Sequence, residues 1–177
     1  NLAAHTPASA GPGTLPPLDV TNPKLLRFRT FSKAYGLAGL RLGYCIGHAD
    51  LIRAFDKIRN HFGVTRLGQA AGIAALADQA HLGRVVVAVA EAREQIAAIA
   101  RRNGLTPLPS ATNFVAIDCG RDGDHAKRVL DALVAAGVFV RMPGVAPLNR
   151  CIRVTAGTAE DLRIFAEELP KALAKAG

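Results

Sequence analysis

One short segment constrains the fold of this chain more than any other: RTFSKAYGLAGLRLGY, from Arg29 to Tyr44. An alternating apolar run, LLRFRTF, leads into it, and a second apolar run, LRLGYCIG, closes it at Gly47. Short apolar runs separated by glycine-rich sequence are typical of β-strands joined by a loop. The segment therefore predicts that Lys33 lies at the end of a strand, in a loop between two strands.

Position alone leaves three interpretations of Lys33: a phosphate-gripping lysine of a nucleotide loop, a covalent catalyst, or a solvated surface charge. A nucleotide P-loop needs its glycines before the lysine, so that backbone amides surround the phosphates. Here Gly36, Gly39 and Gly43 all follow it, which excludes that motif. Most lysines are exposed to solvent, so a surface charge is the ordinary interpretation. Only the neighbouring residues can favour a covalent catalyst instead.

The neighbours of Lys33 favour covalent catalysis with pyridoxal phosphate. A lysine that forms a Schiff base with this cofactor must be held over its ring while other groups bind its phosphate. Thr30 and Ser32 supply hydroxyls just before the lysine, and Arg41 follows across a glycine turn that returns the chain past the same point. Arginine can bind a phosphate dianion through two parallel hydrogen bonds. We therefore expect Lys33 to be the Schiff-base lysine, with Thr30, Ser32 and Arg41 as phosphate ligands.

The same residues carry a resemblance to a known family. TFSKAYGLAGLRLGY resembles the cofactor-lysine signature of fold-type I, class I/II aminotransferases, and is most similar to that of the histidinol-phosphate aminotransferase family. The similarity continues through NHFGVTRLGQAAGIAAL, SATNFVAID, GVFVRMPG and IRVTAGT, so it covers the chain from about Pro23 to the end. It implies an enzyme that uses a Lys33 Schiff base to transaminate an amino acid or a phosphorylated, histidinol-phosphate-like amino compound with a 2-oxo acid.

The resemblance also implies two substrate-binding arginines. Arg153 in IRVTAGT matches the family's arginine for a substrate carboxylate, and Arg141 in VFVRMPG matches one that helps to hold the anionic end of the substrate. Asn113 opens a strand and is as typical of a turn, while Tyr35 and Tyr44 could reach the site or pack against apolar neighbours. The five histidines show no metal-ligand spacing, so no metal site is expected.

Periodicity and the resemblance together predict an α/β chain in four parts. Residues 1–22 read as an irregular leader, and residues 23–80 as a remnant of the large, three-layer αβα domain of a pyridoxal phosphate transferase. Residues 81–104 predict a long connecting helix that Asn103-Gly104 ends. Residues 105–177 predict a small βαββα domain, with strands TNFVAID, VFVR and CIRVTAG and helices DHAKRVLDALVAAG and AEDLRIFAEEL.

Helix signals refine this division. TRLGQAAGIAALADQ predicts a small-residue helix suited to close packing, and Thr158 with Asp161 predicts a cap for the last helix. Pro170 is expected to kink or shorten that last helix. The segment ADLIRAFDKIRNHF predicts one further helix whose apolar face is formed by Leu51, Ile52, Phe55 and Ile58.

Composition limits the expected partners. The formal net charge is +8, but the basic residues are scattered among acidic ones and aromatics are 5% of the chain, so no nucleic-acid partner is expected. No apolar run reaches the roughly 18 to 20 residues of a membrane span. Three widely spaced cysteines without a Cys-x-x-Cys pair indicate a reducing cytoplasm. The resemblance adds a homodimer for the complete enzyme.

The chain also departs from the family pattern. Proteins of this family are longer, and the resemblance implies that their N-terminal half is missing here. That half supplies the aspartate that pairs with the pyridine nitrogen, and only Asp19 precedes Lys33. An incomplete sheet would leave strand edges and apolar faces uncovered. Two alternatives stay open: a non-catalytic fragment or interaction module of the same fold, and a pyridoxal phosphate-dependent decarboxylase of a phosphoamino acid.

Overall fold

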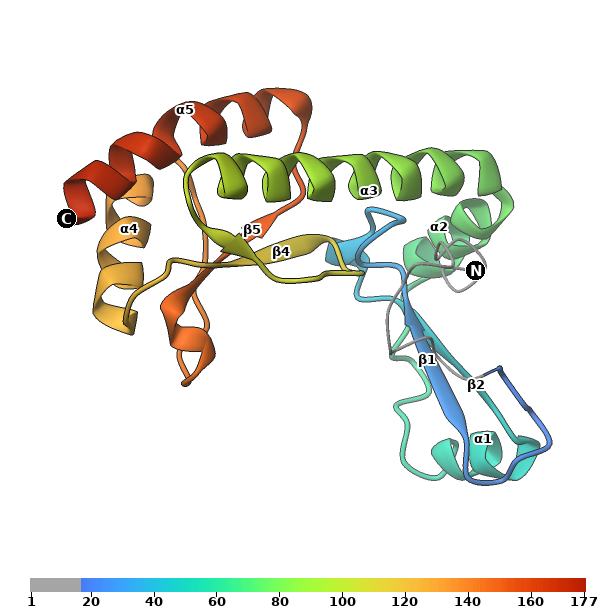
Figure 1. Ribbon diagram of the computed structural model, residues 1–177. Helices are drawn as coiled ribbons and strands as arrows, with labels where there is room; N and C mark the ends of the chain where they lie inside the picture. The colour runs from blue at the N-terminus through green and yellow to red at the C-terminus, as the bar shows by residue number, and fades with distance from the viewer. Residues whose placement is uncertain (1–16) are drawn as a thin grey trace. The chain divides into compact units, whose positions relative to one another are not determined.

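The computed structural model describes residues 17–177 (Figure 1). The chain divides into two compact units, residues 1–86 and 87–177. Residues 1–16 of the predicted leader lie outside the described residues. The rest of the leader, residues 17–22, forms no helix or strand. The first unit contains β1 (Leu26–Thr30), the 3-10 helix η1 (Ala38–Leu40), β2 (Gly43–Gly47), α1 (Ala49–Phe55), α2 (Arg66–Ala77) and the start of α3 (Gln79–Arg102).

The two strands of the first unit form an antiparallel hairpin, which confirms the prediction that the lysine loop lies between two strands. Leu26 pairs with Gly47 at one end and Thr30 with Gly43 at the other. The loop that carries Lys33 therefore leaves and re-enters the sheet at one point, the end of the hairpin that Thr30 and Gly43 close.

Helix α1 follows the hairpin and is shorter than predicted. Phe55 contacts Phe28 of β1 edge to face, with ring centroids 6.4 Å apart. The helix ends there, so the prediction that Ile58 belongs to its apolar face is wrong: Ile58 lies in a turn and is 82% exposed. The backbone hydrogen bonds change there, because the Lys57 amide donates to the Ala54 carbonyl and the Ile58 amide to the Phe55 carbonyl, three residues back instead of four.

Helix α2 confirms the prediction of a small-residue helix built for close packing. Thr65 caps it, with its Oγ1 accepting a hydrogen bond from the Gly68 amide at 3.0 Å. Gly72 is buried, and a Cβ at this position would lie 2.6 Å from Leu42 Cδ2 and 3.8 Å from Phe31 Cζ. The glycine face of α2 therefore packs directly against both ends of the lysine loop.

The second unit is a three-stranded antiparallel sheet with helices (Figure 1). Its strand order is β3-β4-β5. The predicted strands TNFVAID and CIRVTAG are confirmed, as are both predicted helices, and one further short strand follows α3. The elements that follow α3 are β3 (Thr106–Pro107), β4 (Phe114–Asp118), α4 (Gly123–Ala135), the 3-10 helix η2 (Leu148–Arg150), β5 (Cys151–Thr155) and α5 (Ala159–Ala176).

The predicted strand VFVR is wrong. Residues 138–141 form no strand, and only an isolated antiparallel bridge joins Arg141 to Arg153. On the other side of the bridge the ladder cannot continue through Pro143, which has no amide hydrogen. The small unit keeps the predicted order of helices and strands, with a single bridge in place of one strand.

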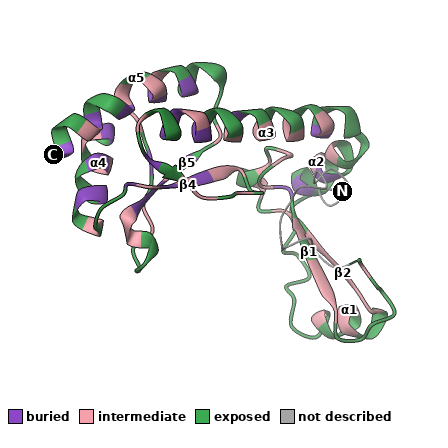
Figure 2. Cartoon of the chain, in the orientation of Figure 1, coloured by how far each residue is buried: buried purple, intermediate pink, exposed green. Residues whose placement is uncertain are grey.

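The core of the second unit lies between one face of its sheet and the helices. Alternate residues of β4 and β5 are buried, and they pack with α3, α4 and α5 (Figure 2). The long helix α3 contributes apolar residues of its second half to this core. The core residues include Ala92, Ile96, Ile99, Val115, Ile117, Val129, Leu133, Ile152, Val154, Phe165 and Leu169. The other face of β4 and β5, with Phe114, Ala116 and Arg153, is only partly covered.

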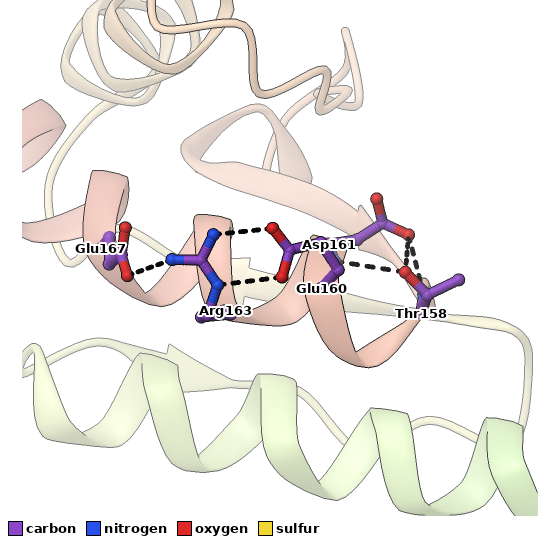
Figure 3. Close-up of polar contacts among 5 residues, drawn as sticks. All are labelled: Thr158, Glu160, Asp161, Arg163 and Glu167. Atoms are coloured by element: carbon purple, nitrogen blue, oxygen red, sulfur yellow. Dashed lines mark hydrogen bonds and ion pairs between the residues drawn. The ribbon is translucent and has the colours of Figure 1, made fainter.

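The predicted cap of the last helix is confirmed as a complete capping box (Figure 3). The Asp161 amide donates to Thr158 Oγ1 at 3.3 Å, and the Thr158 amide donates to Asp161 Oδ2 at 2.8 Å. Arg163 follows on the same helix and forms ion pairs with Glu160 and Glu167. Pro170 does not shorten the helix, which continues to Ala176.

Two further observations on residues 17–177 concern membrane-spanning helices and metal sites. No single helix there is long and apolar enough to cross a membrane; α2 and α3 meet the criteria of length and composition only as a pair, bent by 78°. In the same range no group of three or more His, Cys, Asp or Glu side chains could hold a metal ion.

Candidate functional site

The lysine loop, residues 31–42, is held at its neck by backbone hydrogen bonds. The Phe31 amide donates to the Leu42 carbonyl at 3.1 Å, one step beyond the last pair of the hairpin. The Thr30 hydroxyl accepts a hydrogen bond from the Ser32 amide at 3.0 Å. Because Ser32 follows one side of the neck and Arg41 precedes the other, the loop brings three predicted phosphate ligands to one end of the hairpin.

The aromatic ring of Phe31 anchors the loop from within. Phe31 is only 3% exposed, and its ring centroid lies 5.0 Å from that of Tyr35 and 5.7 Å from that of Tyr44. The Leu37 amide donates to the Phe31 carbonyl at 2.9 Å. Both tyrosines therefore have a packing role, and the loop has a rigid base on which Lys33 is carried.

Lys33 lies on the solvent side of this loop. Its carbonyl accepts a hydrogen bond from the Gly36 amide at 2.8 Å, and Gly36 adopts a φ of 69°, a left-handed conformation that suits glycine. The side chain of Lys33 is exposed, and its Nζ has no hydrogen bond or ion pair with any residue from 17 to 177. The turn therefore presents a lysine amine that no described residue binds.

Arg41 has an unusual backbone. Its φ is 51° and its ψ is 42°, and it is the only residue other than glycine with positive φ in the described part of the chain. Left-handed backbone costs a residue with a Cβ about 1–2 kcal/mol. One guanidinium nitrogen donates to the Ala38 carbonyl at 2.8 Å, and no described carboxylate pairs with it. The loop thus combines a strained conformation with an unneutralised cation, and its neck carries the two hydroxyls.

The two predicted substrate arginines lie together in the second unit. The Arg141 amide donates to the Arg153 carbonyl at 3.1 Å, and the Arg153 amide donates to the Arg141 carbonyl at 2.6 Å. Residues that face each other in an antiparallel bridge project their side chains from the same face. The structure therefore places two cationic side chains next to each other on the partly covered face of the sheet.

Arg153 is a cation without a partner of opposite charge among the described residues. Its Cζ lies 4.9 Å from the ring centroid of Phe114, while its Nε is buried and makes no hydrogen bond. By contrast, Arg150 donates to Asp118 at 2.9 Å. An unpaired buried polar atom is rare in native proteins and calls for an explanation. An anion that binds beside Arg153 would supply the missing acceptor.

Two of the three cysteines are poor nucleophiles. Burial raises the pKa of the Cys119 thiol to about 11, and burial also raises the pKa of Cys151. Since thiolate is the reactive form, both side chains stay unreactive at neutral pH. Cys119, Cys151 and the partly exposed Cys45 are all free thiols.

Sequence reasoning missed one residue of this arrangement, Phe114. It lies at the start of β4, in the segment TNF, and its ring supports the Arg153 guanidinium. The signal was present in the sequence as an aromatic residue at the edge of a strand. Only the register, which pairs Ala116 with Arg153, shows that Phe114 and Arg153 are diagonal neighbours.

Comparison with known proteins shows what this chain is similar to. A model of the family described as "Aminotransferase class I and II" matches residues 6–169. Histidinol-phosphate aminotransferase 2 of Methylococcus capsulatus is 43% identical over 151 residues, which are 85% of this chain and 40% of that protein. Histidinol-phosphate aminotransferase of Bacillus subtilis is 42% identical over 162 residues, which are 89% of this chain and 44% of that protein.

A solved structure agrees with these sequence relatives. The crystal structure of histidinol-phosphate aminotransferase from Sinorhizobium meliloti, in complex with pyridoxal-5'-phosphate, matches with a TM-score of 0.86 at 51% identity. The match covers 89% of this chain and 43% of that one. The predicted α/β fold is thereby confirmed, and the chain spans less than half the length of the relatives that it matches.

Proposed function

Because this chain belongs to the family of class I and II aminotransferases, we propose that it carries the cofactor lysine and the substrate arginines of an aminotransferase that uses pyridoxal phosphate. The reaction is the exchange of an amino group between an amino acid, or a phosphorylated amino compound of the histidinol-phosphate kind, and a 2-oxo acid. One observation carries this proposal. The Lys33 amine has no partner among the described residues, and it lies on a rigid loop whose neck bears two hydroxyls and an arginine.

The side chains of the first unit fit the cofactor. The phosphate of pyridoxal phosphate requires several donors and positive charge, and Thr30, Ser32 and Arg41 offer two hydroxyls and a guanidinium that no described carboxylate neutralises. These three residues would hold the phosphate, and Lys33 would hold the aldehyde end. When bound, the cofactor supplies an electron sink that stabilises negative charge on the carbon that loses its proton.

Lys33 is also the proposed base. An amine in this position would take the proton from the α-carbon of the substrate and deliver it from Nζ to the aldehyde carbon of the cofactor, so that the amino group stays with the cofactor. The turn that Gly36 closes and the ring of Phe31 keep the lysine backbone fixed, so only the flexible part of the side chain has to move. The exposed Nζ, without a hydrogen bond to hold it elsewhere in residues 17–177, is consistent with such movement.

In the second unit we propose that Arg153 binds the carboxylate of the substrate and that Arg141 helps to hold its anionic end. Two cations that project from one face of a sheet repel each other unless an anion lies between or beside them. The unpaired Nε of Arg153 supports the same role. We also propose the roles of the cofactor residues in the first unit, and the division of the chain into the four parts described from the sequence.

The relatives favour transamination over the two alternatives. The matched proteins with 43% and 51% identity are named as aminotransferases, which does not favour a decarboxylase. The retained set of Lys33, Arg41 and Arg153 does not favour a non-catalytic module. A homodimer and a cytoplasmic location complete the proposal, because the family resemblance implies the first and the three free cysteines support the second.

The proposal is tested by trapping the cofactor. We expect that pyridoxal phosphate added to the chain gives a visible absorption band, and that reduction with borohydride fixes one cofactor per chain on Lys33 Nζ. Peptide mass spectrometry locates the modified lysine. Lys33→Ala should lose both the band and the trapped product. Lys57→Ala is the matched control, because Lys57 is an exposed lysine of the same unit that lies outside the loop; it should retain both.

Modification that is spread over surface lysines, with Lys33→Ala labelled as strongly as the native chain, would contradict the role of Lys33. A trapped cofactor on Lys33 in the native chain and in Lys57→Ala, but not in Lys33→Ala, supports it.

A further inference from the structure

The Arg153 guanidinium lies over an aromatic ring. Its Cζ lies 4.9 Å from the centroid of the Phe114 ring. A cation at this distance over a ring face is attracted by the ring quadrupole. The buried Nε makes no hydrogen bond. The ring therefore fixes the direction of the guanidinium without using any of its donors.

The backbone of Arg153 is held on both sides. It pairs with Ala116 of β4 on one side and with Arg141 on the other. These pairings leave the side chain as the movable part of the residue. Because a long arginine side chain loses rotamer entropy when it binds a ligand, a support that already limits its rotamers should raise its affinity for an anion.

Phe114 is itself unusually well fixed at its backbone. Its carbonyl accepts hydrogen bonds from Ser110 Oγ at 2.5 Å and from Thr112 Oγ1 at 3.3 Å. The Thr112 carbonyl in turn accepts a hydrogen bond from Arg93 of α3 at 2.9 Å. The loop before β4 thus connects the Phe114 backbone to the long helix, and the ring is a stable support.

From these contacts we infer that Phe114 is a positioning residue, which holds the Arg153 guanidinium flat and ready for a carboxylate. The inference rests on the proposed function, since it assigns Arg153 to the anionic group of the substrate. Phe114 touches the arginine and does not bind the anion. It therefore acts on affinity through the orientation of Arg153.

The test measures anion binding at Arg153 directly. The full chain is labelled with ¹⁵N, and the Nε–H signal of Arg153 is followed by NMR while succinate, an unreactive dicarboxylate, is added. In the native chain the ring current of Phe114 should shift this signal before any anion is added, and succinate should move it in a saturable manner. Because the signal belongs to one residue, binding at Arg41 in the other unit does not interfere.

Four variants separate positioning from structure. Phe114→Leu keeps an apolar side chain but removes the ring, and we expect it to abolish the ring-current shift and weaken succinate binding about two- to five-fold, as an exposed cation–π contact implies. Phe114→Tyr should restore both. Phe139→Leu is the control, because Phe139 is 79% exposed in the same unit, and it should change neither. Arg153→Leu should abolish saturable binding, which is then followed through the backbone amides of β5.

The outcomes distinguish the two proposals. If Arg153→Leu loses binding while Phe114→Leu, shown to be folded by circular dichroism, binds as the native chain does, the positioning role of Phe114 is wrong and the proposed function stands. If succinate binds equally well to Arg153→Leu, the substrate role of Arg153 fails, and the role of Phe114 fails with it. Weaker binding in Phe114→Leu with recovery in Phe114→Tyr supports the inference.

Discussion

At the scale of single residues, the site combines side chains that are easy to recognise with conformations that are not. Lys33 and its hydroxyl neighbours could be predicted, because cofactor chemistry requires these residue types at short spacing. The left-handed backbone of Arg41 could not, since a glycine at φ of 51° would have been the ordinary choice and nothing in the sequence marks the exception. Phe114 was missed because its contact with Arg153 depends on strand register.

The Arg41 backbone leads to a prediction that separates function from stability. Both Arg41→Ala and Arg41→Gly remove the guanidinium and should weaken the binding of pyridoxal phosphate about 10- to 100-fold, the loss expected for a hydrogen bond to a charged group. Arg41→Gly, however, relieves the left-handed strain that alanine keeps. We expect its free energy of unfolding in urea to exceed that of Arg41→Ala by about 1 kcal/mol.

Arg53→Ala serves as the control for both measurements, because Arg53 is an exposed arginine on α1 in the same unit. An Arg41→Ala variant at least as stable as Arg41→Gly would show that the left-handed conformation is not strained, and unchanged cofactor affinity would remove Arg41 from the phosphate site.

At the scale of elements, the last helix depends on its capping box. The Thr158 hydroxyl and then the Thr158 amide donate hydrogen bonds to Asp161, and they lower the pKa of that carboxylate below its ordinary value of 3.8. A lowered pKa in the folded state means that the stabilisation is present above the ordinary value and is lost as the pH falls through the folded one. The cap should therefore weaken in acid.

We predict that Thr158→Ala lowers the free energy of unfolding by about 1 kcal/mol at pH 7. The difference from the native chain should shrink as the pH falls below the ordinary aspartate value of 3.8. Urea unfolding followed by far-ultraviolet circular dichroism measures both. Thr106→Ala is the control, since Thr106 is exposed and makes no side-chain hydrogen bond in residues 17–177. A difference that stays constant between pH 7 and pH 3 would contradict the role of Asp161.

The same scale shows how far patterns predict elements. Periodicity was sufficient for α2, α4 and α5, where caps and apolar stripes agree. It failed for Val138–Arg141, because alternation of side chains does not reveal whether a partner strand continues; here only Arg141 pairs, and Pro143 follows. It also extended α1 to Ile58, because the spacing of apolar residues does not reveal that the backbone changes from helix to turn after Phe55.

At the scale of the molecule, each unit carries one part of the proposed chemistry. The first unit carries the proposed cofactor residues on a loop that α2 supports, and the second carries the two proposed substrate arginines on a sheet. The first unit also exposes large apolar side chains outside its two strands. They include Ile58, Phe62, Leu67 and Ile73, which are 82%, 92%, 76% and 72% exposed. Exposed apolar surface of this kind is typical of contact regions.

The central claim is that Lys33 makes amino-group transfer possible, and one measurement tests it most directly. The complete natural polypeptide that carries these residues is given pyridoxal phosphate, a 2-oxo acid and, in parallel assays, a phosphorylated amino alcohol or a phosphorylated amino acid, and the new amino acid and released CO2 are quantified in each. We predict an amino acid product without CO2, and a turnover about 10²- to 10⁴-fold lower in Lys33→Ala, the usual contribution of a proton-transferring side chain. Native turnover in Lys33→Ala, or CO2 in place of the amino acid, would contradict the claim.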